Sequence, residues 1–474
     1  MLQDSELITL NNLQKKLSSV KIKNNEKKKY YNQKNQIKDL GINTPHSLQG
    51  FGIVLGWATK AVDCMAERIK WNGYYNPELG DETLTEIVEW LNNLYHDNNF
   101  ESEQRKAIKN ALTTGIGFLS ASKGDVDAGE PPVVWIAEDS NTITIDYDTR
   151  TRKIKSAFKV IYNSLTGNPE YGILWTTDST ISFEKAKNKN KWIEIDRDDH
   201  MMGIVPVVPI FNNADSDNPY GRSEITPSVR DLTDEAMRRL VNAAVNTEYY
   251  AKPYRWAVNL ADGDVAGLSE NGTNILKTTA GDIVVIPTNL EQPDKQADIK
   301  ELSANDPMAI MNTIEPLARL VAREIGVPPS DMGFDTVNPS SADAINAADR
   351  AVIDKANDRI VELRRTFKQL AKVSLLVAGK DYPDNWNIID TVFDKTERMS
   401  PSAAADWLSK LNAVGVYDRV LPDSHYRMLG FNEAEIVELK AYLRTVINTN
   451  IIDQLSEPIT EVIDNTGEVI VEGE

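Results

Sequence analysis

Residues 306–379 decide the fold, and they read DPMAIMNTIEPLARLVAREIGVPPSDMGFDTVNPSSADAINAADRAVIDKANDRIVELRRTFKQLAKVSLLVAG. Asp306 is placed to cap a helix whose first residue is Pro307, where a missing N–H costs nothing. Apolar residues then recur every three or four positions as far as Ile325, which predicts a helix with one buried stripe. Pro316 lies within that stripe and predicts a kink.

A break and a second, longer helix follow. Gly326, Pro328 and Pro329 end the first helix, so residues 327–339 are predicted to be a loop. The second helix is predicted from Ser340, with a capping box formed by Asp343, to Gly379. At about 1.5 Å per residue it is on the order of 60 Å long. A helix of that length needs a large body to lie on.

The bulk composition predicts a large globular protein without a metal site, a cofactor or a membrane span. A chain of 474 residues is long enough for several domains, and 41% of its residues are apolar. Cys64 is the only cysteine and the four histidines share no short motif, so neither a disulfide within the chain nor a thiolate metal site is expected. The sequence contains no run of eighteen apolar residues and no signal peptide, so we expect a cytoplasmic site of synthesis and assembly.

The net charge is strongly negative. A formal charge of −19 argues against tight nucleic-acid binding, because affinity for phosphate comes chiefly from Lys and Arg. An acidic conduit is compatible with the same charge, since a wall that repels the DNA backbone lets a duplex slide. An ordinary acidic soluble protein is equally compatible, and is the more frequent kind.

The N-terminal half divides into a basic segment and a mixed domain. Residues 1–40 are rich in Lys and Asn, which predicts either a basic arm that touches nucleic acid or an acidic partner, or, more commonly, a solvated helical or mobile N-terminus. Residues 41–220 contain three helical segments and then a region of period two. That region predicts six strands of one antiparallel sheet: 133–136, 142–147, 157–162, 172–177, 180–183 and 192–195. The cluster of Glu194, Asp196, Asp198, Asp199 and His200 favours an acidic hairpin over a metal site, because its spacing matches no ligand motif.

The second half is built from helices around a small insert. Thr226 and Pro227 start a helix within 221–251, and the non-helical residues 252–305, with strands near 254–258 and 282–287, separate it from the helix of 306–326. Residues 380–450 begin with a strand-like run and continue as short helices. The tail 451–474 has seven acidic residues and no basic one, and is predicted to be mobile.

Two motifs carry a family resemblance. Ile325-Gly-Val-Pro-Pro-Ser-Asp-Met-Gly-Phe334, followed by Asn338-Pro-Ser-Ser-Ala-Asp-Ala-Ile345, resembles the portal proteins of tailed bacteriophages, specifically those of long-tailed siphophages. The resemblance implies an α+β portal fold. Its parts would be a mixed wing (41–220), two stem helices (221–251 and 306–326), a small α/β clip (252–305), a tunnel loop (327–339), a long wing helix (340–379) and a crown-like helical region (380–450).

The resemblance also implies a function and its partners. A ring of typically twelve chains would occupy one capsid vertex of the virion, and double-stranded DNA would enter and leave through it without sequence-specific binding. Twelve copies would carry a formal charge of 12 × −19 = −228, consistent with a repelling passage. The implied partners are the large terminase subunit, the head-completion (adaptor) protein, and the major capsid and scaffolding proteins. No catalytic residue is implied, because the packaging ATPase is a separate motor.

The implied site residues fall into three groups. The tunnel loop would present Val327, Pro328, Pro329, Ser330, Asp331, Met332, Gly333, Phe334, Asp335 and Thr336, with Asp331, Met332, Phe334 and Asp335 nearest the DNA. The stem would present Arg230, Asp234, Glu235, Arg238 and Arg239. The clip would dock the motor and the connector through Tyr254, Trp256, Asp282, Val284 and Ile286.

Two alternatives from other classes stay open at this point. The sequence contains no phosphate-binding loop, no nucleophile elbow and no zinc-protease helix. An acidic α+β hydrolase could still hide its active carboxylates among the many Asp and Glu residues. A non-portal virion or scaffold-binding protein would share the helical pattern but form no central hole.

Overall fold

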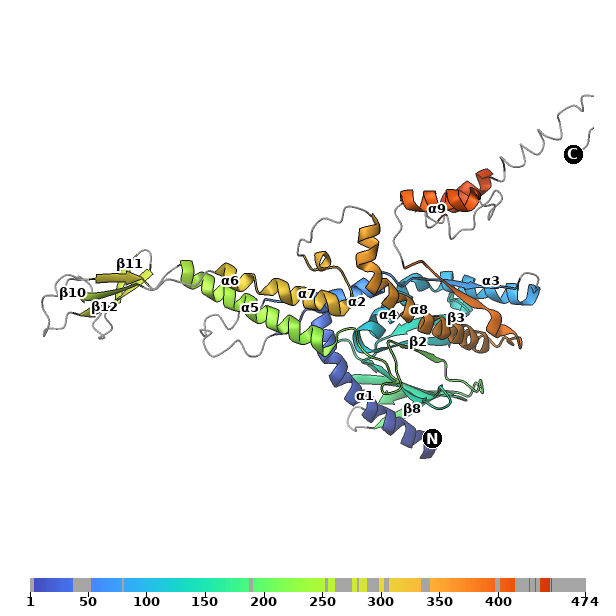
Figure 1. The fold of residues 1–474 in the computed structure, drawn as a ribbon. Helices are drawn as coiled ribbons and strands as arrows, with labels where there is room; N and C mark the ends of the chain where they lie inside the picture. The colour runs from blue at the N-terminus through green and yellow to red at the C-terminus, as the bar shows by residue number, and fades with distance from the viewer. Residues whose placement is uncertain are drawn as a thin grey trace, which may run out of the picture. The chain divides into compact units, whose positions relative to one another are not determined.

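The computed structural model describes most of the chain in two units. The described residues are 4–36, 53–78, 81–186, 191–251, 255–260, 275–278, 281–287, 298–301, 307–333, 342–396 and 401–413, with 426, 431, 435–443 and 445. The units comprise residues 1–396 and 397–474 (Figure 1). The second unit contains the helix α9 (Pro401–Ala413). Among the described helices, none combines the length and the apolar character that crossing a membrane requires.

The first unit combines groups of helices with groups of mostly antiparallel strands, which confirms the mixed α+β class. The helices are α1 (Asp4–Tyr31), α2 (Trp57–Ala66), α3 (Glu82–Asp97), α4 (Phe100–Thr114), α5 (Pro227–Ala251), α6 (Pro307–Met311), α7 (Ile314–Ile325) and α8 (Ala342–Val377). The strands are β1 (Trp71–Tyr75), β2 (Ile116–Lys123), β3 (Val133–Glu138), β4 (Ile143–Asp148), β5 (Lys153–Tyr162), β6 (Pro169–Thr176), β7 (Thr180–Lys185), β8 (Trp192–Asp198), β9 (Val207–Phe211), β10 (Arg255–Leu260), β11 (Ile275–Thr278), β12 (Gly281–Pro287), β13 (Asp298–Glu301) and β14 (Asp390–Phe393).

The six strands predicted between residues 133 and 195 exist but do not form one sheet, so that prediction is wrong. Strands β4 to β8 form an antiparallel meander, whereas β3 pairs with β2 in a second sheet of order β3-β2-β9. The two sheets pack through apolar residues such as Phe118, Ile145 and Trp175. Sequence periodicity reports that a segment is a strand, but the choice of neighbour depends on contacts that are distant in sequence.

The N-terminal segment is a packed helix and not a free basic arm. Leu10, Leu13 and Leu17 of α1 are buried against Phe158 and Phe183 of the meander. These leucines are three and four positions apart, so they form one face of the helix. The prediction of a mobile or nucleic-acid-binding arm is therefore corrected for residues 4–31, whose helical alternative is the observed one.

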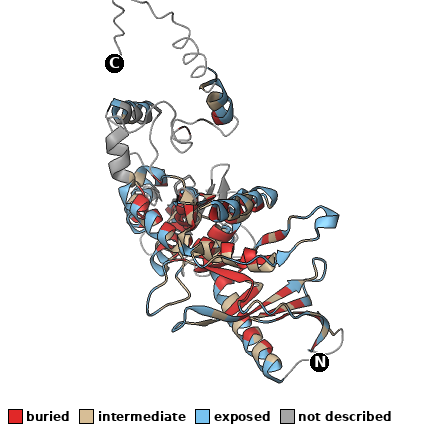
Figure 2. Ribbon diagram, turned by 90° about the vertical axis from the view of Figure 1, so that its right-hand side faces the viewer, coloured by how far each residue is buried: buried red, intermediate tan, exposed pale blue. Residues whose placement is uncertain are grey.

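The main core lies where α2, α3, α4 and α8 meet. Figure 2 shows buried residues, in red, on strands and on the sides of helices that face the interior, and the main cluster includes residues of these four helices. At its centre the ring of Trp71 stacks on Phe367 of α8, with ring centroids 4.1 Å apart and planes inclined by 5°. Phe100 meets Trp71 edge to face at 5.6 Å. Both Trp71 and Phe367 are fully buried, so this contact joins β1, which begins at Trp71, to the long helix α8.

The boundary predicted at residue 380 is too early. Strand β14 pairs antiparallel with β1, with Tyr75 opposite Asp390 and Trp71 opposite Phe393. The first unit therefore continues to Thr396. Pairing with a strand more than 300 residues earlier could not be recognised from the local pattern of 388–393.

We expect Phe367→Ala to destabilise the protein by about 3–5 kcal/mol, because it removes a fully buried ring and leaves a cavity against Trp71. Urea unfolding followed by tryptophan fluorescence measures this loss. Val361→Ala on the same helix is the control, since Val361 is 68% exposed and its truncation should change stability by less than about 0.5 kcal/mol. Equal losses from the two variants would contradict the packing described here.

Candidate functional site

The candidate site begins with a pair of helices that flank a small sheet in the sequence. Helix α5 starts at the predicted residue, where the backbone N–H of Val229 donates to the Thr226 hydroxyl over 3.2 Å and Pro227 takes the first helical position. Helices α6 and α7 both pack on α5. The order helix, sheet, helix predicted for 227–325 is therefore the observed order.

The second helix of the pair is interrupted rather than kinked at Pro316. Helix α6 ends at Met311, and a turn at Asn312 and Thr313 leads into α7. Proline has no N–H to donate to the carbonyl four residues earlier, and its ring clashes with that carbonyl. For Pro316 this carbonyl belongs to Asn312, so the break lies where the steric conflict is, four residues before the proline.

One arginine of α5 stabilises this break. Arg239 donates from Nη1 to the carbonyl of Thr313 over 3.0 Å, and from Nε to Glu235 over 2.9 Å. The Arg239 hydrogen bond, assisted by Arg238, lowers the pKa of the Glu235 carboxyl. Glu235, Arg238 and Arg239 therefore act within the helix pair. The four-residue spacing of Glu235 and Arg239 predicts their ion pair, whereas the sequence does not predict the contact of Arg239 with Thr313.

The other two predicted stem residues contact α1. Arg230 forms an ion pair with Glu26, and Asp234 accepts a hydrogen bond from the Tyr30 hydroxyl over 2.6 Å. Burial and this hydrogen bond raise the pKa of Tyr30. Sequence reasoning missed these contacts because the partners are 204 residues apart.

The turn after α7 is built by glycine and proline. Gly326 has a φ of 92°, and the N–H groups of Gly326 and Val327 donate to the Ala322 carbonyl over 2.8 and 3.0 Å. This is the hydrogen-bonding pattern of a helix that ends on a left-handed residue. Pro329–Met332 then form a 3-10 turn that ends on Gly333, at a φ of 83°.

The described part of the predicted tunnel loop is anchored and partly buried. Val327 and Met332 belong to the main core, with exposed fractions of 5% and 9%. Asp331 pairs with Lys60 of α2 over 3.2 Å. The prediction that Met332 faces DNA therefore conflicts with its burial in this chain, whereas Ser330, Asp331 and Gly333 are exposed. Phe334, Asp335 and Thr336 lie outside the described residues.

Helix α8 holds the C-terminal end of α7 in place. Lys355 donates to the carbonyls of Glu324 and Ile325 over 2.7 and 3.1 Å, which satisfies oxygens that no helical N–H can reach. The ammonium group also lies at the negative end of the α7 dipole. Arg359 of α8 pairs with Glu224, just before α5, over 3.2 Å. The two helices of the pair are thus both tied to α8.

The small sheet has the order β11-β12-β10-β13. Strand β10 pairs parallel with β12, and Trp256 lies opposite Val284. Asp282 and Ile286 lie on β12 with Val284. Asp282 is opposite Lys277 of β11, and Ile286 is opposite Val258 of β10. Trp256 is 40% exposed, whereas its neighbour Ala257 is buried. The described residues of 252–305 form strands only, so the predicted α/β character is not seen in them, and Tyr254 lies outside them.

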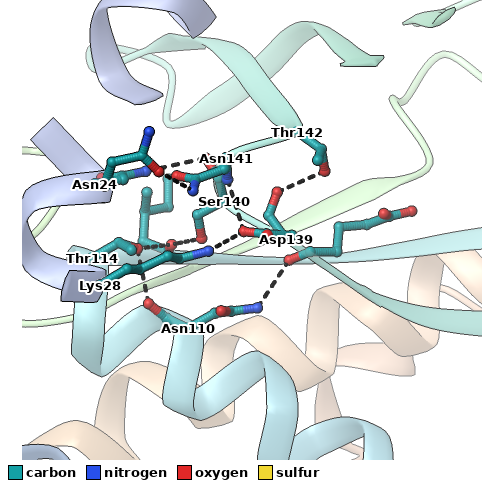
Figure 3. Close-up of polar contacts among 11 residues, drawn as sticks. Asn24, Lys28, Asn110, Thr114, Asp139, Ser140, Asn141 and Thr142 are labelled. Atoms are coloured by element: carbon teal, nitrogen blue, oxygen red, sulfur yellow. Dashed lines mark hydrogen bonds and ion pairs between the residues drawn. The ribbon is translucent and has the colours of Figure 1, made fainter. Parts of the chain in front are cut away.

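A polar cluster fixes the end of α1 to α4 and to the loop between β3 and β4 (Figure 3). Asn24 donates to the carbonyl of Ser140 over 3.1 Å, and Lys28 forms an ion pair with Asp139. Lys27 donates to the carbonyl of Thr114 over 2.7 Å, and burial lowers the pKa of its ammonium group, with Arg230 contributing. The lysines of this segment are thus partly structural.

A cavity of about 380 Å³ lies beside this cluster. Its lining includes Lys28 and Tyr31 from α1, and Lys106, Lys109 and Asn110 from α4. Each of these lysines has a carboxylate partner: Lys109 pairs with Asp63 over 2.7 Å, Lys106 pairs with Glu103, and Lys28 pairs with Asp139, which also lines the cavity. The lysines of the cavity are therefore ion-paired. Among the described residues, no group of His, Cys, Asp and Glu is arranged to hold a metal ion.

Comparison with known families decides the identity of the chain. Residues 11–421 match the family described as "Phage portal protein, SPP1 Gp6-like". The chain belongs to this portal protein family. The resemblance seen at residues 325–345 is thereby confirmed. Members of the family are structural, non-enzymatic components of the phage capsid, so the hydrolase alternative is excluded.

Relatives of known name agree with this assignment. The portal proteins of Mycobacterium phages L5 and D29 are each 26% identical over 422 and 421 residues, which is 87% of this chain and 83% of theirs. Two solved structures are similar at 14% identity. The neck of the native gene transfer agent (GTA) particle computed with C12 symmetry has a TM-score of 0.40 and covers 79% of this chain and 90% of its own. The neck of the empty GTA particle computed with C6 symmetry has a TM-score of 0.39 and covers 83% and 95%.

We expect Arg239→Met to destabilise the portal chain by about 1–2 kcal/mol, because the Thr313 carbonyl and Glu235 each lose a charged hydrogen-bond donor. Arg238→Met is the matched control, since Arg238 is 51% exposed and bonds to Glu235 alone among the described residues. Differential scanning calorimetry of both variants measures the difference. A control as damaging as Arg239→Met would show that the Thr313 contact contributes nothing.

Glu235 predicts a pH dependence with a definite sign. Since its folded pKa is lowered, the stability it contributes is present above its unfolded pKa near 4.5 and is lost as pH falls through the lower folded value. Glu235→Gln should therefore be less stable than the wild type at pH 7, and the gap in urea midpoint should narrow below about pH 4.5. A gap that stays constant with pH would contradict this role.

Proposed function

We propose that twelve copies of this portal chain form a ring at one vertex of the capsid and that double-stranded DNA passes through its centre. The observation that carries the proposal is the element order within the family match: α5, then the four-stranded sheet, then α6 and α7, inside residues 11–421. Two helices that bracket a small sheet can be repeated side by side about an axis. The acidic total of −19 per chain supports sliding rather than binding.

In this proposal α5, α6 and α7 are the stem. Arg239, which also pairs with Glu235 within α5, keeps α5 and the interrupted helix α6–α7 in register through its hydrogen bond to the Thr313 carbonyl. Among the described loop residues, fewer can face the channel than the sequence predicted. Ser330, Asp331 and Gly333 are its exposed described residues, while Val327 and Met332 anchor it to the core. Asp331 keeps its ion pair with Lys60 at this exposed surface.

The four-stranded sheet is the proposed clip. Its strand β12 carries Asp282, Val284 and Ile286, and Trp256 on β10 offers a partly exposed ring, a residue type that often anchors protein interfaces. We assign to it the docking of the large terminase subunit during packaging and of the head-completion protein afterwards. Contacts with the major capsid and scaffolding proteins, and assembly in the host cytoplasm before incorporation into the virion, belong to the same proposal.

Electron microscopy of the purified full-length chain, together with native mass spectrometry, tests the ring. We expect particles of about twelve chains with a central opening wide enough for a DNA duplex, because a head-to-tail interface that closes on itself generates a ring. Monomers or dimers under all conditions would overturn the proposal. A closed assembly without an opening would overturn it too, in favour of a non-portal virion or scaffold-binding protein.

A further inference from the structure

Two segments of the first unit carry charges of opposite sign, and each contains almost no charge of the other sign. Residues 15–34 contain eight lysines and one acidic residue, Glu26. Residues 71–104 contain eight carboxylates and neither Lys nor Arg. The first segment is the basic half of α1 and the turn after it, and the second includes all of α3. A chain with a net charge of −19 thus concentrates positive charge on one helix.

The lysines that point outward from α1 have no carboxylate partner. Lys15, Lys23 and Lys29 are exposed, and they fall within about 120° of the helix circumference. None of the three ammonium groups forms a hydrogen bond or an ion pair with another residue in the part of the chain that the structure describes. Glu26 lies on the same face and pairs with Arg230, so the three lysines are the charges of this face that are left without a partner among the described residues.

The acidic face of α3 is equally free. Glu82, Glu86 and Glu89 are four and three positions apart, so they form one stripe, and all three are exposed. Among the described residues they have no cationic partner. Like charges at this spacing destabilise an isolated helix by a few tenths of a kcal/mol per pair, so the stripe is not explained by the stability of α3 itself.

The two faces do not meet within one chain. Helix α1 contacts the C-terminal end of α4, where Lys27 donates to Thr114. Helix α3 contacts the N-terminal part of α4, where Gln104 donates to the Tyr95 hydroxyl over 3.1 Å. The body of α4 therefore separates a basic face from an acidic one. Different patches that complement each other on one chain are the requirement for a head-to-tail interface.

We infer that the outward lysine face of α1, Lys15, Lys23 and Lys29, docks on the carboxylate stripe of α3, Glu82, Glu86 and Glu89, of a second copy of the chain. The inference rests on the proposed ring and names the surfaces that join neighbouring copies. Complementary charge fixes the register of such a contact and repels a misaligned one. Because both faces are exposed before assembly, the contact weakens as added salt screens the charges.

Charge reversal on each face separately, and then on both, tests the inference. The variant K15E/K23E/K29E changes the net charge from −19 to −25, and E82K/E86K/E89K changes it from −19 to −13. We expect each variant to raise the concentration at which half of the chains are in rings by about tenfold or more, since three ion pairs become three repulsions. The combined six-fold variant returns to −19, and we expect it to assemble like the wild type. Circular dichroism checks that each variant is folded, and analytical ultracentrifugation measures assembly.

The control K123E/K153E/K191E makes the same change of −6 at exposed lysines outside α1, and we expect it to assemble normally. Rings that tolerate both triple variants would overturn the inference and leave the proposed ring intact. Loss of assembly in both triple variants without rescue in the combined one would also overturn it, because the faces would then have different partners. If the control assembled as poorly as K15E/K23E/K29E, the change in net charge alone would explain the loss of assembly, and the inference would be overturned as well. Wild-type chains that form no rings would instead refute the proposed function.

Discussion

The burial of one long helix is the constraint on which the rest of the first unit depends. Helix α8 contacts β9, β2, α2 and β14, and its stripe of Val352, Ile360, Phe367 and Leu370 is buried in the main core. In a folded protein most of the stability of a helix comes from the packing of its apolar face and not from its own hydrogen bonds and propensities. The stability of the 36-residue helix α8 therefore comes from this packed face. Elements that are far apart in the sequence are brought together because each contributes to covering it. The stacking of Trp71 on Phe367 is the point where the earliest and latest strands of the unit, β1 and β14, meet the helix.

The same helix determines where the pair formed by α5 and the interrupted helix α6–α7 can lie. Lys355 and Arg359 are four positions apart on α8, and they hold the end of α7 and the start of α5 respectively. In the proposed ring this pair of helices has to stay in register. Here the register is set from outside the pair, by α8, and from inside it, by the contact of Arg239 with Thr313. The partly buried ion pair of Arg359 and Glu224 also favours this one register, because a shifted α5 would leave both charges without partners.

The features predicted correctly from the sequence are those that local chemistry decides. Pro227 with Thr226, and Gly326 with Pro328, mark the ends of α5 and α7, because capping and the lack of an N–H act within a few residues. The family was recognisable for the same reason, since its motif lies at this capped break. The failures concern partners. The pairing of β3 with β2, the pairing of β14 with β1, and the docking of α1 on the meander all depend on which distant surface is apolar or unpaired. The burial of Met332 belongs to the same class, because a loop that looks open in the sequence is closed by a core it helps to fill.

The lysines of α1 show why composition alone misleads about partners. A lysine-rich N-terminus suggests a nucleic-acid arm, yet its inward lysines bind neutral oxygens of the chain: Lys16 donates to the Ile145 carbonyl and the Tyr220 hydroxyl, Lys21 to the Tyr162 hydroxyl, and Lys27 to the Thr114 carbonyl. An ammonium group in such a site satisfies a carbonyl or a phenol while its methylene stem covers apolar surface. Three of the eight lysines in residues 15–34 are thereby committed to holding α1 on the meander and on α4. Helix α1 is consequently held in place, and a charged face on such a helix can specify the position of a neighbour. A flexible arm with the same lysines cannot specify that position, because it would lose much more conformational entropy on binding.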